Sequence, residues 1–331
     1  MTAHKISRRS FLTGALAFAA LSAASLSGCG SKTSKVKVGT MPTEDILPLW
    51  VAEQEGLFSK HNVEVEIVPF DSAQNLSAAI TAKEVDLAMT DPMRAVKLCE
   101  SGTALSMEWI TLGTTAQQGR FGVLTAANSG FTTLADLLQA TKGVGVAANT
   151  VPEYVFDKLC EQAGIDPSQI KTSEVPSLPE RYSLASAGSL DAAALPGSML
   201  ALGEVSGMVV LADDTQGDNV SQSVMVARTE YKEGEGAAGI ESLRAVWDEA
   251  ADLVNANPEN YRALLAQKAN LNDAVVDSYP ICEYPHASTD AGTSAYPPAD
   301  LIEPQIEWMK QKGYATSNVA YDETTGTFQI S

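Results

Sequence analysis

The stretch Ala82-Lys83-Glu84-Val85-Asp86-Leu87-Ala88 recurs 105 residues later as Ala187-Gly188-Ser189-Leu190-Asp191-Ala192-Ala193. Upstream, Glu53-Gln54-Glu55-Gly56-Leu57 matches Glu161-Gln162-Ala163-Gly164-Ile165 at an offset of 108 residues. One alternative is that any two strand–helix–strand units look alike, but two ordered matches favour two lobes built on one plan. A repeat of this length indicates paired domains, because solenoid repeats span roughly 20 to 50 residues.

Short apolar runs alternate with helical patterns on both sides of this stretch, which is typical of a parallel α/β sheet. The runs Val36–Gly39, Val63–Val68 and Val85–Met89 predict three strands. A helix is expected to begin at Asp91-Pro92, with Asp91 as its N-cap. The predicted fold class is therefore α/β, with two lobes that each hold a mainly parallel sheet flanked by helices.

The chain is expected to pass between the lobes twice. The strand-like runs Phe121–Thr125 and Ser223–Arg228 each follow a turn-rich loop. They predict two crossing strands that form a hinge. By this interpretation lobe I comprises residues 36–122 together with 223–331, and lobe II comprises residues 123–222.

The N-terminus carries two export signatures in order. Ser7-Arg8-Arg9-Ser10-Phe11-Leu12 resembles a twin-arginine signal, and it precedes an apolar stretch too short to span a membrane comfortably. Leu26-Ser27-Gly28-Cys29 resembles a bacterial lipobox, in which the cysteine is acylated and the peptide is cut before it. We therefore expect a signal peptide over residues 1–28, a lipidated Cys29 and a tether over 29–35. The protein is expected to be exported and anchored at the outer face of the cell membrane or in the periplasm.

Composition excludes several classes of function. The 22 Lys and Arg residues against 41 Asp and Glu residues give a formal charge of −19, which repels nucleic-acid backbones and anionic membranes. Beyond Cys29, the odd number of cysteines (Cys99, Cys160 and Cys282) argues against a disulfide framework. Cys99 and Cys160 lie on apolar helical stripes, where thiols are usually buried and inert.

Several segments resemble solute-binding proteins for sulfonates, nitrate and thiamine precursors. Val36-Lys37-Val38-Gly39 followed by Leu49-Trp50-Val51-Ala52-Glu53-Gln54-Glu55-Gly56-Leu57-Phe58 is similar to the opening of that family, and the repeated stretch and Tyr284-Pro285 are similar to later segments. The resemblance covers about Val36 to the C-terminus. It implies a two-lobed clamshell of the type 2 periplasmic-binding-protein fold, which closes on a ligand between the lobes.

The candidate ligand-binding residues come from loops that follow strands, where small hydroxyls and helix N-termini can donate hydrogen bonds to a ligand. Tyr154 is a candidate for stacking on a planar ligand. The full candidate set is Thr43, Asp45, Thr90, Asp91, Thr114, Asn149, Thr150, Tyr154, Pro196, Gly197 and Ser198.

Most of these residues also have a structural interpretation. Thr150 with Glu153 forms a potential capping box, and Asp91 or Asp45 can cap the helix that follows it. Tyr154 can belong to the core. Arg120 and Arg181 are the arginines we place near these segments, and surface salt bridges are the default role for both.

No catalytic arrangement is evident, and no His or Cys spacing predicts a metal site or a cofactor. The leading prediction is a non-enzymatic solute-binding lipoprotein that delivers a small molecule to the permease and ATPase subunits of an ABC importer. Alternatives are an exported enzyme of the pyrimidine-precursor-synthase type on the same fold, or a ligand-sensing subunit. Since Glu44, Asp45 and Asp91 lie in the predicted loops, we expect a neutral or amine-bearing organic solute in preference to an inorganic anion.

Overall fold

The computed structural model describes residues 34–216, 221–288 and 296–331. The chain divides into Met1–Thr33 and the compact unit Ser34–Ser331. The predicted signal peptide, the lipidated Cys29 and most of the tether therefore lie outside the described residues. Within the described part, no helix combines the length and apolar character that a membrane span requires.

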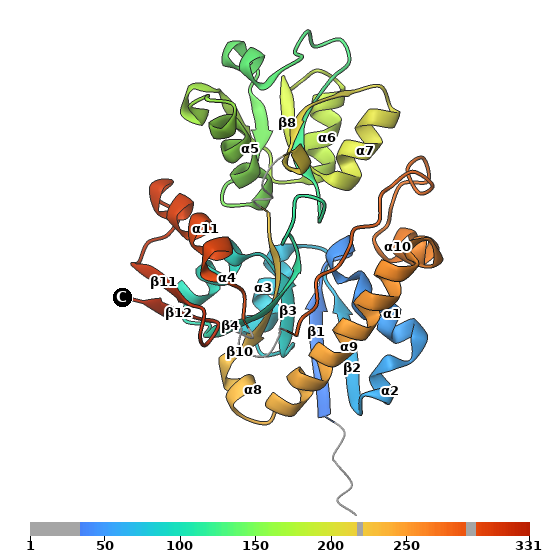
Figure 1. The fold of residues 1–331 in the computed structure, drawn as a ribbon. Helices are drawn as coiled ribbons and strands as arrows, with labels where there is room; N and C mark the ends of the chain where they lie inside the picture. Colours follow the sequence, from blue (N-terminus) through green and yellow to red (C-terminus); the bar gives the residue numbers. More distant parts are fainter. Residues whose placement is uncertain (1–33, 217–220, 289–295) are drawn as a thin grey trace, which may run out of the picture. The chain divides into compact units, whose positions relative to one another are not determined.

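The compact unit contains two separate sheets (Figure 1), as the repeat predicted. The first sheet has the order β11-β12-β4-β10-β3-β1-β2, and β1 pairs in parallel with both β2 and β3. β10 runs antiparallel to both of its neighbours, β3 and β4. The bounds are β1 Ser34–Thr40, β2 Val63–Pro69, β3 Leu87–Thr90, β4 Leu105–Leu112, β10 Ser223–Arg228, β11 Val319–Asp322 and β12 Thr327–Ile330.

The second sheet repeats this arrangement with the order β7-β6-β8-β5-β9. β6 pairs in parallel with β7 and β8, and β5 runs antiparallel to β8 and β9. In both sheets the first strand of the repeat thus lies between the second and the third. The bounds are β5 Phe121–Thr125, β6 Val144–Val146, β7 Thr172–Glu174, β8 Ala192–Pro196 and β9 Val209–Asp213.

An aspartate holds the equivalent strands together in each sheet. The Asp86 carboxylate accepts a hydrogen bond from the backbone N–H of Lys37 at 3.0 Å, in the middle of β1. Its counterpart in the repeat, Asp191, accepts from the backbone N–H groups of Lys142 at 2.5 Å and Gly143 at 2.9 Å, at the start of β6. The Asp shared by the two repeated stretches therefore has the same structural role in both lobes.

Helices cover both faces of the first sheet (Figure 1). On one face α1 and α9 pack against alternate strand residues such as Leu87 and Met225, and on the other α3, α4 and α11 pack against Ala88 and Val226. This period of two is the alternation that a buried strand imposes. The bounds are α1 Leu47–Glu55, α2 Leu57–Lys60, α3 Ala73–Thr81, α4 Pro92–Glu100, α8 Thr229–Glu233, α9 Ala237–Ala256, α10 Arg262–Lys268 and α11 Ala299–Gln311.

The second sheet is also covered on both faces. α5 lies over one hydrophobic cluster, whereas α6 and α7 contribute to the other. The bounds are α5 Val151–Gln162, α6 Leu178–Ser186 and α7 Gly197–Val205, with 3-10 turns η1 Glu44–Ile46, η2 Leu134–Gln139, η3 Pro167–Gln169, η4 Asp214–Gln216 and η5 Pro258–Tyr261. All three described cysteines are unpaired; Cys160 is buried, and Cys99 and Cys282 are partly buried.

The two crossings meet at Gly113. Its φ of +101° is left-handed, and an added Cβ would lie 2.0 Å from the carbonyl oxygen of Ser221 in the return crossing. The Gln222 side chain donates to the Gly113 carbonyl at 3.1 Å. The expected lobe boundary after residue 122 falls inside β5, which pairs only within the second sheet, whereas β10, which begins at Ser223, pairs only within the first.

Candidate functional site

Four of the predicted loops follow strands that have a parallel partner in their own sheet. They begin after Thr40 of β1, Thr90 of β3, Val146 of β6 and Pro196 of β8. Because parallel strands end at the same edge, each sheet brings its two loops together at its carboxyl edge. Ligands of open α/β sheets bind at such edges.

Two carboxylates lie in the loop after β1. The Ser223 hydroxyl donates to Asp45 Oδ2 at 2.6 Å, while Asp45 Oδ1 is buried without a hydrogen-bond partner. Burial raises the pKa of Glu44 to about 7, against a lowering by the Tyr279 hydroxyl, which hydrogen-bonds its carboxylate. Burial also raises the pKa of Asp45. Thr43 is exposed and occupies the N-cap position of η1, but its side chain makes no capping hydrogen bond. Asp45 lies inside η1 and does not cap a helix either.

Asp91 caps α4, as predicted, by accepting from the backbone N–H of Arg94 at 2.8 Å. Burial raises its pKa although the nearby Arg94 charge lowers it. Thr90 is partly buried and pairs with Val224 of β10. Asp91 follows Thr90 at the end of β3, and Ser223, the residue that binds Asp45, precedes Val224 at the start of β10, so both residues border the last pair of this ladder.

Asn149 and Thr150 follow β6, and the predicted capping box is wrong. The Thr150 hydroxyl donates back to the carbonyl of Ala147 at 2.7 Å and does not reach the helix N–H groups. Glu153 accepts instead from the backbone N–H of Asn149 at 2.7 Å. Asn149 adopts a φ of +56°, and its side-chain oxygen is buried without a partner.

Tyr154 is a core residue, as its structural interpretation predicted, and its ring is not exposed for stacking on a ligand. It is 2% exposed, and its ring meets that of Trp308 edge-on at 5.2 Å. Trp308 belongs to α11 and donates from Nε1 to Asp157 of α5 at 2.8 Å. Tyr154 therefore joins α5 to α11.

The remaining candidates lie near the crossings. Gly197 begins α7 after Pro196, and an added Cβ there would lie 3.1 Å from both the Arg120 carbonyl and the Tyr279 hydroxyl. Ser198 is partly buried. Thr114 is exposed, and its hydroxyl and backbone N–H both donate to the Gln118 side-chain oxygen, at 2.7 and 2.8 Å. Gln118 thus orders the first crossing.

The expectation of surface salt bridges is right for Arg120 and wrong for Arg181. Arg120 pairs with Asp213 at 2.7 Å and Glu204 at 2.8 Å, so its charge is neutralised. Arg181 is 1% exposed and donates to the carbonyls of Val175 and Ala194. Sequence reasoning also missed Arg94, whose buried Nε has no hydrogen-bond partner.

Sequence reasoning missed a second group, which the C-terminal half contributes. The Tyr284 hydroxyl donates to the Glu44 carbonyl at 2.7 Å, and Cys282 Sγ accepts from the backbone N–H of Gly119 at 3.3 Å. Burial raises the pKa of Cys282 to about 12, and the negative charges of Glu44, Asp45 and Asp214 add to that rise. These charges place the thiol next to the acidic loop. Tyr284-Pro285 was the only signal in the sequence.

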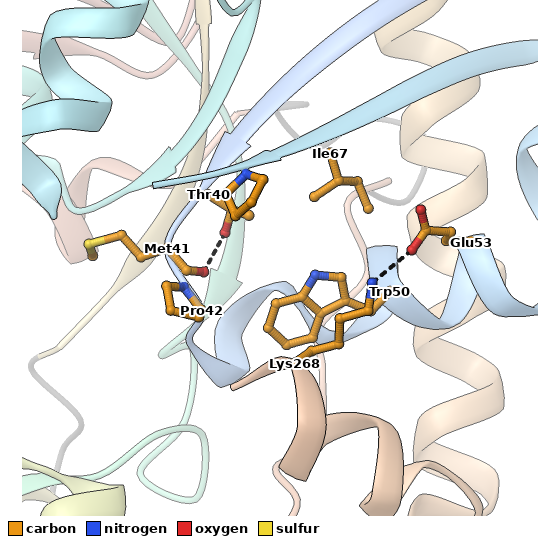
Figure 2. Close-up of a pocket in the computed structure, with 8 residues that line it drawn as sticks. Thr40, Met41, Pro42, Trp50, Glu53, Ile67 and Lys268 are labelled. Atoms are coloured by element: carbon orange, nitrogen blue, oxygen red, sulfur yellow. Dashed lines mark hydrogen bonds and ion pairs between the residues drawn. The ribbon is translucent and has the colours of Figure 1, made fainter. Parts of the chain in front are cut away.

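A pocket of about 130 Å³ adjoins the loop after β1 (Figure 2). Met41, Pro42, Trp50 and Ile67 line it, and Lys268 pairs with Glu53 at its side at 3.0 Å. No residue of the second sheet lines it. It therefore differs from the candidate site, which needs loops from both sheets.

The described residues contain no group of His, Cys, Asp or Glu side chains arranged to hold a metal ion. What the arrangement offers is hydrogen bonding, from three carboxylates, small hydroxyls, one arginine and an asparagine amide.

The model of the NMT1-like family matches residues 30–264. No curated protein sequence matches the chain significantly. Among solved structures, the periplasmic aliphatic sulphonate binding protein SsuA from Escherichia coli aligns with a TM-score of 0.71 at 20% identity, over 85% of this chain and 94% of that one. The alkanesulfonate-binding protein SsuA from Xanthomonas axonopodis pv. citri, bound to MOPS, aligns at 0.67 and 16% over 86% and 94%. The periplasmic nitrate-binding protein NrtA from Synechocystis aligns at 0.58 and 14% over 72% and 66%.

Proposed function

The chain belongs to the NMT1-like family, and on that premise we propose that it is an extracytoplasmic solute-binding lipoprotein. It captures a small organic molecule between its two lobes and delivers it to the permease and ATPase subunits of an ABC importer. It performs no chemistry on that molecule. Its fold is that of periplasmic binding proteins, and the structural neighbours named above are binding proteins.

One observation carries the proposal. Loops from both sheets present buried polar atoms that the folded chain leaves without a partner, including Asp45 Oδ1 and Asn149 Oδ1. Such atoms are rare in native proteins because each has lost its water without gaining a replacement. A bound solute supplies the missing partners.

Charge supports a neutral or amine-bearing solute, including planar heterocycles such as a pyrimidine, over an inorganic anion. The loops carry Glu44, Asp45 and Asp91, and each of these carboxyl groups repels an anion in its ionised form. Arg120, which could have offset them, is held by two carboxylates of its own. Arg94 is one positive charge against three carboxyl groups.

A thermal-shift screen of small solutes followed by calorimetric titration tests the proposal. Binding at a hundred times Kd stabilises the folded state by about 2.7 kcal/mol, which gives a clear rise in Tm. We expect amino-heterocycles or other amine-bearing solutes to bind. Tight binding of nitrate or an alkanesulfonate, with none for the amines, contradicts the charge assignment but leaves solute binding intact. If no solute binds, the function itself is wrong.

Export and anchoring complete the proposal. Residues 1–28 act as the signal peptide, the twin-arginine pathway exports the folded chain, and Cys29 receives the lipid. The motifs at Arg8-Arg9 and at Leu26-Ser27-Gly28-Cys29 support this sequence of events. A tethered carrier stays close to the membrane components that it supplies.

A further inference from the structure

Three buried polar atoms without a hydrogen-bond partner lie on the predicted loops or in the first turn after one. They are Asp45 Oδ1 after β1, Arg94 Nε in the first turn of α4, and Asn149 Oδ1 after β6. Two of these residues were candidates from the sequence alone, and the third follows the candidate Asp91 by three positions.

Two of the three residues, Asp45 and Arg94, follow strands that end at the carboxyl edge of the first sheet. Asp45 binds Ser223, which precedes Val224 in the last β3–β10 pair, and Asp91, which follows Thr90 of that pair, caps the backbone of Arg94. Lys97, one turn further along the same face of α4, donates to the carbonyl of Tyr314 at 3.0 Å.

The Tyr314 hydroxyl then donates to Glu153 at 2.9 Å, and Glu153 accepts from the Asn149 backbone. Tyr314 therefore connects α4 with the first turn of α5. The segments that carry the three atoms adjoin one hydrophobic cluster, because Met93 belongs to it and Met41 and Val151 pack against it.

The chemistry of the three atoms is mixed. Asp45 Oδ1 and Asn149 Oδ1 need a donor, whereas the Nε–H of Arg94 needs an acceptor. An inorganic anion has no N–H or O–H group to give to the two oxygens. A simple alkylamine has no oxygen to give to the guanidinium. Neither kind of molecule alone satisfies the region.

We infer that the ligand is two-ended: an oxygen acceptor group binds Arg94, and an N–H or O–H donor group binds Asp45 and Asn149. Amino acids with separated ends, amino-sulfonates and amides belong to this class. The inference rests on the proposed function and specifies the ligand class of the same site. It also explains how an acidic site holds a molecule that carries a carboxylate or a carbonyl, because Arg94 supplies a local positive charge.

Matched series of probes test the inference. One series runs from 3-aminopropanoate to 6-aminohexanoate with 4-aminobenzoate, and it is compared with the alkylamines, alkanoates, aniline and benzoate of equal size. We expect two-ended probes to raise Tm and to bind at least about tenfold more tightly than either one-ended analogue, since a charged hydrogen bond changes affinity by about tenfold or more. One-ended probes that bind as tightly as their two-ended partners overturn the inference, while solute binding stands. If neither these probes nor any other solute in the screen binds, both this inference and the proposed function are wrong.

Variants separate a ligand contact from a structural role. In Arg94→Met the two-ended probe is expected to bind no better than its one-ended amine, whereas general damage to the fold would weaken both equally. Lys171→Met is the control for the lost charge, because Lys171 is exposed and donates only to the carbonyl of Thr141. In Lys171→Met, the ratio of the affinity for the two-ended probe to the affinity for its one-ended amine should match the wild-type ratio. An unchanged ratio in Arg94→Met overturns the role of Arg94.

Asn149→Gly removes the amide while it keeps the left-handed backbone. Asn62→Gly is its control, because Asn62 has a similar φ of +54° but is exposed. We expect about a tenfold loss of affinity for the two-ended probe in the first variant and none in the second. Equal affinities in both variants remove Asn149 from the site.

Discussion

At the scale of the residue, Gly113 decides how closely the two crossings approach. Its backbone is left-handed, and the space that a Cβ would need is occupied by the Ser221 carbonyl. Only glycine satisfies both conditions. The hinge between the lobes therefore depends on one missing side chain.

Gly113→Ala is expected to lower the free energy of unfolding by about 3 kcal/mol, because it adds backbone strain to a clash with a carbonyl. Urea denaturation measures the change. Gly102→Ala is the matched control, since Gly102 has a φ of +95° but nothing within 4 Å of an added Cβ. If Gly113→Ala and Gly102→Ala lower the free energy of unfolding equally, the contact between Gly113 and Ser221 does not contribute to stability.

The carboxyl group of Glu44 should make stability depend on pH. Its pKa is raised from 4.5 to about 7 in the folded chain, so between these values the folded state binds a proton that the unfolded state has released. The contribution is fully present below pH 4.5 and is lost as the pH rises through 7. We expect the ligand-free protein to be more stable at about pH 5.5 than at about pH 8.

Glu44→Gln should reduce this difference in urea denaturation. Glu259→Gln should not, because Arg262 lowers the pKa of that carboxyl, which stays ionised across the range. A wild-type protein that gains stability as the pH rises from 5.5 to 8 would contradict the assignment of Glu44.

The sequence predicted the loops better than the contacts within them. Asp91 was placed as a cap because Asp before Pro at a helix start is a local pattern. Tyr284 was not placed beside Glu44, because 240 residues separate them and only the folded chain brings them together. Thr150 looked like a cap, yet its hydroxyl reaches back to Ala147, a choice between two nearby partners that spacing cannot decide.

At the scale of the element, the repeat was visible because both sheets need the same aspartate. Asp86, just before β3, hydrogen-bonds to β1, and Asp191, just before β8, hydrogen-bonds to the residue before β6. Each aspartate thus connects the third strand of its repeat to the first. What the repeat could not predict is the contact between α5 and α11. α11 lies outside both repeated stretches, so the repeat gives no information about its contact with α5. That contact depends on how the lobes are joined.

Besides its aromatic contact, the joint between α5 and α11 includes an ion cluster around Lys312, the C-cap residue of α11. Lys312 binds Glu153 at 3.1 Å and Asp157 at 3.0 Å, and both carboxylates are below 10% exposed. Removing the cation leaves two nearly buried negative charges facing each other. Lys312→Met is therefore expected to lower the free energy of unfolding by about 2 kcal/mol, less than for a fully buried pair because Lys312 is 35% exposed.

Urea denaturation also measures this change, with Lys310→Met as the control because Lys310 is exposed on the same helix. Glu153→Gln in the Lys312→Met background should recover part of the loss by removing one of the two charges. If Lys310→Met and Lys312→Met lower the free energy of unfolding equally, the ion cluster does not stabilise the contact between α5 and α11.

At the scale of the whole molecule, a formal charge of −19 keeps the protein soluble and away from anionic surfaces. The folded part thus gives no electrostatic attraction to a membrane. The proposed anchoring at the membrane therefore rests on the N-terminal segment, and single substitutions there test it.

Cys29→Ser should release the protein from the membrane, either as soluble material or as an uncleaved precursor, because serine offers no thiol for acylation. Fractionation of cells followed by immunoblotting measures the change. Cys99→Ser is the control, since that thiol lies in the folded domain. If wild type and Cys29→Ser are equally soluble, the lipobox interpretation is wrong.

Replacement of Arg8 and Arg9 by Lys should leave folded protein in the cytoplasm, because the twin-arginine pathway requires the guanidinium pair and charge alone does not replace it. Lys5→Arg serves as the control for a basic residue outside the pair. Export that continues unchanged in the double variant would identify the general secretory route.

The way lobe II begins and ends has a consequence for engineering. It starts on β5 and finishes on β9, and Gly122 and Asp213 at these two ends are direct partners in the ladder. A segment whose ends are already adjacent can be exchanged as a cassette without a change in the length of either junction. Chimeras of two proteins with this architecture should therefore be joined at these two strands.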